Sequence, residues 1–372
     1  MLETYSQLKV EELFAAADIK VNGDRPGDIQ VHNPDFYARA LTQGSLGIGE
    51  SYMDGWWDCE RVDEFFTKIF YAKIDRKVAP WKLIIPYLTA KIANLQSRKK
   101  APEVCERHYN LGNDLYQTML DNRMTYTCGY WKNAQTLEQA QEDKLELVCK
   151  KLGLREGQRV LDIGCGWGSF LKYAAEKHGA EGVGITISNE QIELAQKLCK
   201  GLPIEIRYQD YRDVHEKFDH VVSLGMFEHV GYKNHRKYLE VASGCLKDEG
   251  LFLLHTIGGN RSEVDIDPWI AKYIFPNSVL PSIAQIGSAM EDLFVMEDWH
   301  NFGLDYGRTL MEWHTNFETH WDSLKDRYDE QFHRMWNFYL LSCAGTFRAR
   351  RNQLWQIVLS KDGVPGGYQS IR

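Results

Sequence analysis

Short apolar segments alternate with amphipathic stretches over the second half of the chain. Five of these segments are predicted to be buried strands, because each is a short apolar run followed by turn or helix-capping residues. They are Val160–Ile163, Gly182–Thr186, Ile204–Tyr208, His220–Leu224 and Leu251–Thr256. Strands that alternate with helices are typical of a parallel sheet covered by helices on both faces. The pattern therefore predicts an α/β fold with a doubly wound sheet.

The first part of the chain has a different pattern. Residues 5–71 have helical periodicity interrupted by glycine and proline, with a possible short hairpin at Ile29–Val31. Because 372 residues are many for one compact unit, we expect a small, mainly helical domain over residues 1–85. A basic linker over 86–107 and a catalytic domain over 108–372 would follow. Residues 258–328 are rich in aromatic side chains, and we expect them to form a lid over the ligand-binding ends of the strands.

Positive charge is concentrated in one segment. Between Lys73 and Lys100, eight residues are basic and one is acidic, and aromatic and aliphatic residues lie between them. This composition is typical of a segment that binds an anionic membrane surface, although a solvated linker between domains has it too. The whole chain has a formal net charge of −8, which argues against a general nucleic-acid-binding protein.

Eight cysteines are scattered along the chain without the spacing of a metal site. We therefore expect reduced thiols, as in a cytoplasmic protein, and no bound metal. The chain starts without the basic and apolar regions of a signal peptide, and no apolar run approaches the roughly 20 residues of a membrane span. The expected protein is soluble or peripheral to the membrane.

A glycine-rich loop follows the first predicted strand. Gly164–Gly168 has the spacing Gly-x-Gly-x-Gly, which differs from the Gly-x-Gly-x-x-Gly of dinucleotide-binding proteins. A turn without side chains suits the amino acid and ribose of S-adenosylmethionine. The next strand ends at Thr186, where dinucleotide enzymes usually carry a carboxylate, and Ser188 with Gln191 predicts a capped helix start. The pattern favours S-adenosylmethionine over a nicotinamide cofactor.

Two polar residues follow the fourth and fifth predicted strands. Glu228 comes shortly after one strand and His255 lies at the end of the other. Because ligands bind at the carboxyl ends of the strands in such a sheet, a carboxylate and an imidazole would meet there and could transfer protons. The structural alternatives are a carboxylate at a helix start and a hydrogen-bonded core histidine.

Several blocks of sequence together resemble the cyclopropane-fatty-acyl-phospholipid synthase family. The blocks are Met124–Trp131, Gly164–Gly168, Gly225–Gly231, Leu254–Gly258 and Trp299–Tyr306. The similarity covers nearly the whole chain and includes Gly47–Trp57 in the helical domain. It implies a Rossmann-like class I methyltransferase domain that transfers a methylene group from S-adenosylmethionine to a cis double bond of unsaturated acyl chains in membrane phospholipids. It also implies a homodimer at the inner face of the cell membrane.

The resemblance assigns roles to individual residues. S-Adenosylmethionine would be held by Tyr126, Thr127, Asp162, Gly164, Gly166, Gly168, Thr186, Gln191, Gln209, Asp210 and Tyr211. A bound bicarbonate would be held by Cys128, Glu228, His255, Tyr306 and the backbone of Ile257. Cys343 matches a cysteine proposed to be catalytic in the family, although an apolar helix around a thiol is also typical of a buried structural cysteine.

The implied reaction explains why such residues are needed. An alkene is a weak nucleophile, so the sulfonium methyl must be held in line with it at about 3–3.5 Å. Its attack leaves a carbocation, and ring closure requires a base while bulk water is excluded. Glu228 could be this base, whereas the resemblance implies that bicarbonate accepts the proton. The alternatives are a methyltransferase of another amphipathic substrate and a non-catalytic S-adenosylmethionine-binding module.

Overall fold

The computed structural model describes residues 2–76 and 112–372, which belong to two compact units. Unit 1 consists of residues 1–93, 264–276 and 306–352, and unit 2 of residues 94–263, 277–305 and 353–372. Nearly all of the basic segment Lys73–Lys100, and the whole expected linker over 86–107, lie outside the described residues. The proposed boundaries there stay predictions.

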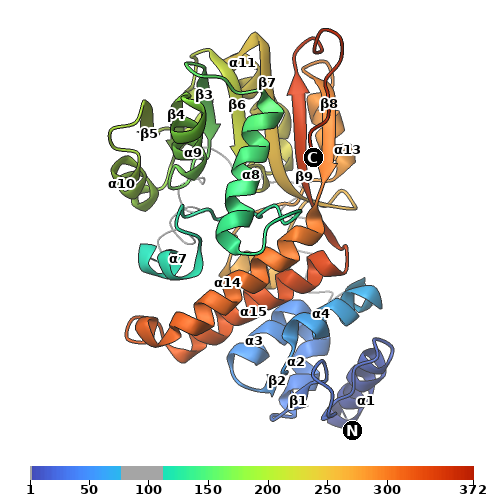
Figure 1. Cartoon of the computed structure of the whole chain (residues 1–372). Coiled ribbons are helices and arrows are strands. Elements are labelled where there is room, and N and C mark those ends of the chain that lie inside the picture. The colour runs from blue at the N-terminus through green and yellow to red at the C-terminus, as the bar shows by residue number, and fades with distance from the viewer. Residues whose placement is uncertain (1, 77–111) are drawn as a thin grey trace. The chain divides into compact units, whose positions relative to one another are not determined.

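A seven-stranded sheet forms the centre of unit 2, in the order β5-β4-β3-β6-β7-β9-β8 (Figure 1). The strands are β3 (Arg159–Ile163), β4 (Glu181–Thr186), β5 (Ile204–Tyr208), β6 (Phe218–Leu224), β7 (Leu246–Gly259), β8 (Val295–Asn301) and β9 (Asn352–Ser360). Strands β3 to β7 pair in parallel, whereas β8 and β9 pair antiparallel. The five predicted strands are confirmed as β3 to β7, and two further strands, β8 and β9, were not predicted.

Helices cover both faces of this sheet, because neighbouring residues of a strand point to opposite sides. Leu161 of β3 packs in the same apolar cluster as Tyr238 of α11, whereas Val160 packs with Leu145 of α8 in a second cluster. The helices of unit 2 are α7 (Asn113–Met119), α8 (Leu137–Leu152), α9 (Ser169–His178), α10 (Asn189–Leu198), α11 (His235–Cys245) and α13 (Ile283–Met290). Figure 1 shows α8 and α9 in front of the sheet. The doubly wound fold is confirmed.

Unit 1 is mainly helical. Its elements are α1 (Leu2–Ala15), β1 (Gln30–Val31), α2 (Asp35–Gln43), α3 (Ser45–Met53), β2 (Trp57–Asp58), α4 (Val62–Tyr71), η1 (Ile74–Arg76), α12 (Pro268–Tyr273), most of α14 (Gly303–Leu324) and α15 (Glu330–Arg348). Strand β1 pairs with β2, so the expected local hairpin is instead a pairing of distant segments. Helix α15 packs closely on α4, since a Cβ at Gly345 would lie 2.7 Å from the Cβ of Phe66.

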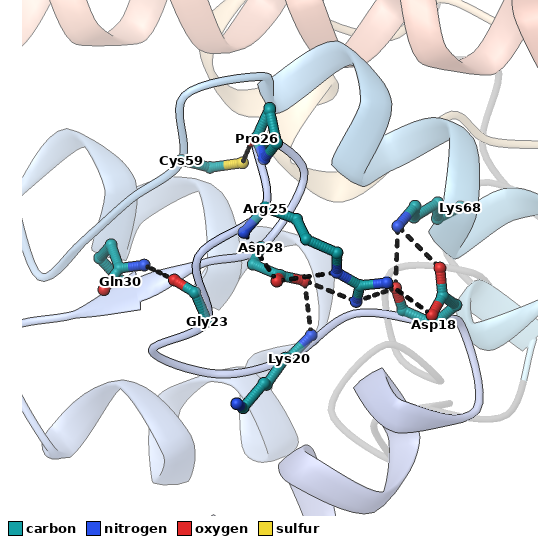
Figure 2. A network of polar contacts seen from close by, with 9 residues as sticks. All are labelled: Asp18, Lys20, Gly23, Arg25, Pro26, Asp28, Gln30, Cys59 and Lys68. Carbon is teal, nitrogen blue, oxygen red and sulfur yellow. Dashed lines mark hydrogen bonds and ion pairs between the residues drawn. The ribbon is translucent and has the colours of Figure 1, made fainter.

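The N-terminal part of unit 1 is held by a buried carboxylate (Figure 2). Asp28 accepts hydrogen bonds from the backbone N–H groups of Lys20 and Arg25, at 2.8 and 3.2 Å, and from the Arg25 guanidinium. The Arg25 guanidinium also donates to the carboxylate of Asp18, which in turn accepts a hydrogen bond from the ammonium of Lys68 in α4. This network ties the loop after α1 to α4.

The region expected to form one aromatic lid is divided in the structure. Residues 277–305 form α13 and β8 in unit 2, whereas residues 264–276 and those from 306 onward belong to unit 1. The helices α12, α14 and α15, which the sequence interpretation placed in a domain over 108–372, thus group with the N-terminal helices. In the described parts of the chain, no helix is long and apolar enough to cross a bilayer.

Candidate active site

A pocket opens in unit 2 where the loops that follow β3, β4, β5 and β6 meet. Most of the residues predicted to bind the cofactor line this pocket. They are Tyr126, Thr127, Asp162, Gly164, Gly166, Thr186, Gln191, Gln209, Asp210 and Tyr211. Segments that are far apart in the sequence are therefore brought together as the strand order requires. The remaining predicted cofactor residue, Gly168, is not part of the lining.

The glycines of the loop after β3 have different roles. Gly164, Gly166 and Gly168 all have positive φ angles, of 84°, 55° and 82°, which other residues adopt at a cost. A Cβ at Gly164 would lie 2.7 Å from Met226, and one at Gly168 would lie 2.8 Å from the sulfur of Cys199. A Cβ at Gly166 would meet nothing within 4 Å. Gly166 thus keeps space free in the pocket, whereas Gly168 allows the start of α9 to pack closely.

The start of α10 forms the predicted capped turn. The Ser188 hydroxyl accepts the N–H of Gln191 at 3.3 Å. The Thr186 hydroxyl donates to Oε1 of Gln191 at 2.9 Å and accepts the N–H of Ser188 at 3.1 Å. The prediction of a helix start at Ser188 is confirmed, and these contacts orient Thr186 and Gln191 at the pocket wall.

Asp162 is the charged residue of β3 that faces α8, because it alternates with Leu161 and Ile163. Its side chain is 2 % exposed, and its Oδ1 has no hydrogen-bond partner among residues 2–76 and 112–372. Burial raises the pKa of Asp162 to about 7, against the effect of the Lys144 ammonium. An unpaired buried carboxylate oxygen in a pocket lining is suited to accept a donor, such as an amine, from a bound molecule.

A second group of polar residues lies at the ends of β6 and β7. Leu224 of β6 is in register with His255 of β7, and the N–H of Gly225 donates to the His255 carbonyl at 2.9 Å. The N–H of Ile257 donates to Oε1 of Glu228 at 2.6 Å. The two strands are neighbours as predicted, with Glu228 after β6 and His255 within the last part of β7. We call Glu228, His255 and the backbone of Ile257 the niche.

The niche contains two unsatisfied polar atoms. In the described chain, neither Oε2 of Glu228 nor Nε2 of His255 has a hydrogen-bond partner. Burial raises the pKa of Glu228 to about 7, while the hydrogen bond from Ile257 opposes this shift. Burial, followed by the positive charges of Lys144 and Lys151, holds the pKa of His255 well below its ordinary value. The niche thus combines a carboxyl whose pKa is raised by burial with an imidazole that burial keeps neutral.

The other residues assigned to the bicarbonate site have different locations. Cys128 is buried in unit 2, and its thiol donates to the Gly129 carbonyl at 3.1 Å. Tyr306 and Cys343 belong to unit 1, so their membership in one site with Glu228 stays a prediction. Burial raises the pKa of Cys343 to about 12. Its thiol is therefore protonated at neutral pH, the residue itself is partly exposed, and its catalytic role stays a prediction.

Sequence reasoning missed residues of α8 at this site. Lys144 lines the pocket and is 0 % exposed, as is Gln141 one turn earlier on the same helix. Both lie in a polar stretch, Glu138–Glu146, which would usually be a solvated helix face. Leu137, Leu145 and Val148 mark the buried side of α8, and their periodicity was the available signal that a lysine between them is buried too.

Residues 96–357 match a family described as mycolic acid cyclopropane synthetase. The chain belongs to this family. It is 52% identical over 362 residues to the cyclopropane-fatty-acyl-phospholipid synthase of Escherichia coli (strain K12). This alignment covers 97% of this chain and 94% of the E. coli protein. It is also 36% identical over 279 residues to a probable fatty acid methyltransferase of Pseudomonas putida, covering 71% of this chain and 70% of the relative. The family resemblance of the sequence blocks is thus confirmed.

Solved structures agree with this placement. The cyclopropane synthase MmaA2 from Mycobacterium tuberculosis has a TM-score of 0.66 and 29% identity, covering 70% of this chain and 98% of that one. Mycolic acid cyclopropane synthase CmaA1, complexed with SAH and CTAB, has a TM-score of 0.66 and 28% identity, again over 70% of this chain and 98% of the other. The fold is that of class I S-adenosylmethionine-dependent methyltransferases.

Proposed function

We propose that this protein transfers a methylene group from S-adenosylmethionine to the cis double bond of unsaturated acyl chains in membrane phospholipids. The product would be a cyclopropane ring, and a bound bicarbonate would accept the proton. The observation that carries this proposal is the presence, in one unit, of a pocket with the predicted cofactor residues and a niche with unsatisfied Glu228 and His255 atoms.

The residues of the pocket fit S-adenosylmethionine. The Gly166 backbone leaves room for a ligand to approach, and the unpaired Oδ1 of Asp162 can accept a donor. When bound, this cofactor supplies a methyl group activated by its sulfonium. Gln191 and Thr186 are fixed by the α10 cap and would orient the ribose.

The residues of the niche fit bicarbonate. A carboxylate and a bicarbonate repel each other unless a proton is shared, and the raised pKa of Glu228 means that a protonated carboxyl is available near neutral pH. The protonated carboxyl can donate to an oxygen of the anion. Nδ1 of the neutral His255 accepts from the side-chain amide of Gln356 at 3.3 Å, so its Nε2 carries the hydrogen and can donate as well. Glu228 would then hold the ion rather than abstract the proton itself. The anion would take the proton that ring closure releases.

Three further parts of the proposal come from the sequence and the relatives. The phospholipid substrate follows from the name of the E. coli relative. Association with an anionic membrane at the inner face of the cell membrane follows from the basic segment, and a homodimer follows from the resemblance. Neutralising Arg98, Lys99 and Lys100 together should weaken binding to anionic vesicles at low salt, whereas unchanged co-sedimentation would mean that these charges are only solvated.

The decisive experiment incubates the full chain with methyl-labelled S-adenosylmethionine and vesicles of an unsaturated phospholipid, with and without added bicarbonate. The labelled carbon should enter the acyl chain as a ring methylene, identified by carbon NMR, and the rate should rise with bicarbonate. Matched vesicles of a saturated phospholipid should take up no label. Label in a methyl branch would instead indicate a branching methyltransferase, and absence of label from the lipid would contradict the proposal.

A further inference from the structure

Helix α8 holds the loop that carries Tyr126, Thr127 and Cys128. The side-chain amide of Gln141 donates to the carbonyl of Thr127 at 2.7 Å and to that of Thr125 at 3.3 Å. The ammonium of Lys144 donates to the Thr127 hydroxyl at 2.7 Å. Two side chains one turn apart on a rigid helix thus fix both the backbone and the side chain of Thr127.

The same loop is fixed from its other end. Oδ1 of Asp121 accepts the N–H of Thr125 at 2.7 Å, and Oδ2 accepts the Thr125 hydroxyl at 3.2 Å and the N–H of Arg123 at 3.1 Å. Met124, between these contacts, has a φ of 60°, which is uncommon for a residue with a side chain. Such a conformation persists only where its surroundings impose it, and a strained loop held from both ends is typical of functional sites.

The position of Lys144 is unusual for a lysine. Its side chain is 0 % exposed and lines the pocket. The titratable groups that act on it are Asp121 and Cys128 of the loop and Asp162 of β3, and its charge in turn acts on His255 of β7. Burial lowers the pKa of Lys144 to about 8, while Asp121 opposes this shift. A buried ammonium is costly, so its retention beside the cofactor loop calls for a role.

We propose that Lys144 is a positioning residue that acts through the Thr127 hydroxyl. It sets the loop so that Tyr126 and Thr127 line the cofactor pocket and Cys128, the next residue, stays buried. The cofactor and the proton acceptor must lie on opposite sides of one reacting carbon, and small errors in such placement are costly in rate. The role of Lys144 in turnover rests on the proposed function, whereas its coupling to Thr127 does not.

The matched control lies on the same helix. Lys151 is also buried, at 1 % exposure. It bonds Nδ1 of His300 at 3.1 Å and lies 3.7 Å from Asp298, and it is not part of the pocket lining. Replacing either lysine by methionine removes a buried ammonium and keeps most of the side-chain volume. Both charges also act on His255, whose imidazole is kept neutral mainly by burial. A purely structural role, or an effect through His255, would therefore give both variants the same defect.

The experiment compares Lys144→Met, Thr127→Val, their double variant and Lys151→Met in the full chain. Turnover is measured with labelled S-adenosylmethionine and unsaturated phospholipid vesicles, S-adenosylhomocysteine affinity by calorimetry, and folding by Tm. We expect Lys144→Met to lower kcat about 100-fold, and the double variant to be no worse than the poorer single variant. Thr127→Ser, which keeps the hydroxyl, should lose less than Thr127→Val. Lys151→Met should lower Tm with kcat changed less than about 3-fold.

Two outcomes would overturn the proposal. One is a double variant whose loss is the product of the single losses, because the two residues would then act independently. The other is an equal loss of kcat in Lys151→Met and Lys144→Met. If the wild-type protein labels no lipid, the proposed function fails. The S-adenosylhomocysteine affinities of the two single variants and the double variant still test whether Lys144 and Thr127 act together. Should Lys144→Met not fold, Lys144→Gln replaces it in the cycle.

Discussion

The N–H of Ile257 donates a 2.6 Å hydrogen bond to one oxygen of Glu228, while the other oxygen of this buried carboxyl has no partner among the residues that the structure describes. The backbone of β7, near its end, thus fixes the orientation of a carboxyl that follows β6. A carboxyl fixed at one oxygen presents the other in a defined direction. When this carboxyl is protonated, its second oxygen can donate a hydrogen bond in that direction, as the proposed anion site requires.

Replacing Glu228 by glutamine should separate binding from turnover. The amide keeps the shape and can accept from Ile257, but it cannot share a proton with an anion. We expect kcat to fall about 100-fold while S-adenosylhomocysteine affinity changes less than about 3-fold. Labelled transfer assays and calorimetry measure the two effects. An equal loss in cofactor affinity would contradict the assignment of Glu228 to the niche.

Glu228→Gln, which should lower turnover, should at the same time raise the stability of the fold. Because the pKa of Glu228 is raised to about 7 from 4.5, folding favours the protonated form. Its contribution to stability is complete below about pH 4.5 and is lost as the pH rises through 7. In bicarbonate-free buffer, Glu228→Gln should therefore gain stability relative to the wild type over this range, by up to about 3 kcal/mol. Chemical denaturation at pH 4.5 and pH 8 measures it, and a pH-independent difference would argue against the raised pKa.

Gly166→Ala should weaken cofactor binding. An alanine at this position would have to adopt the φ of 55° seen for Gly166, which costs about 1–2 kcal/mol of backbone strain. Its methyl group would also occupy the open space of the pocket. Gly153→Ala is a matched control, since Gly153 has a φ of 60° and also no atom within 4 Å, but it ends α8 and is not part of the pocket lining. We expect similar losses of stability, but at least about 10-fold weaker S-adenosylhomocysteine binding only in Gly166→Ala. Equal affinities would place the cofactor elsewhere.

Asp28→Ala should destabilise unit 1. It removes the acceptor of two backbone N–H groups and of the Arg25 guanidinium, at an expected cost of about 2–4 kcal/mol. Asp18→Ala removes an exposed partner of the same Arg25 and should cost less than about 1 kcal/mol. The Arg25 hydrogen bonds lower the pKa of Asp28 to about 2, so its contribution should be lost as the pH falls from about 4 to 2. Urea denaturation of the two variants tests the contrast.

Cys343 should react slowly with iodoacetamide at neutral pH. Burial raises its pKa to about 12, and only the thiolate is nucleophilic. Mass spectrometry of the labelled native chain, with urea-unfolded protein as the control, measures the rate at this position. Labelling as fast as in the unfolded chain would restore Cys343 as a candidate reactive residue.

The parallel part of the sheet could be predicted because each of its strands is a local apolar run. Ile204–Tyr208 agrees with β5 at both ends. The strand β8 could not be predicted, since Val295–Asn301 contains two acidic residues and a histidine, and only β9 of distant sequence completes it. Aromatic residues in that region suggested a lid instead. Strands whose pairing is non-local carry a weak local signal.

The candidate site shows the same limit. Glu228 and His255 could be found because strand ends in a doubly wound sheet converge on one edge. The burial of Lys144 could be inferred from the apolar periodicity of α8, but its role could not, because nothing in the sequence reveals that its ammonium meets Thr127, 17 residues earlier in the chain. Only the packing of α8 against the sheet removes this lysine from water.

The chain contributes three separate stretches to unit 1, the last of them ending at Asn352, the first residue of β9. A gene fragment that starts or stops between the two units therefore always leaves one of them without a piece of its core. Chimeras with relatives would have to exchange several fragments at once, and an N-terminal deletion would strip α4 from α15.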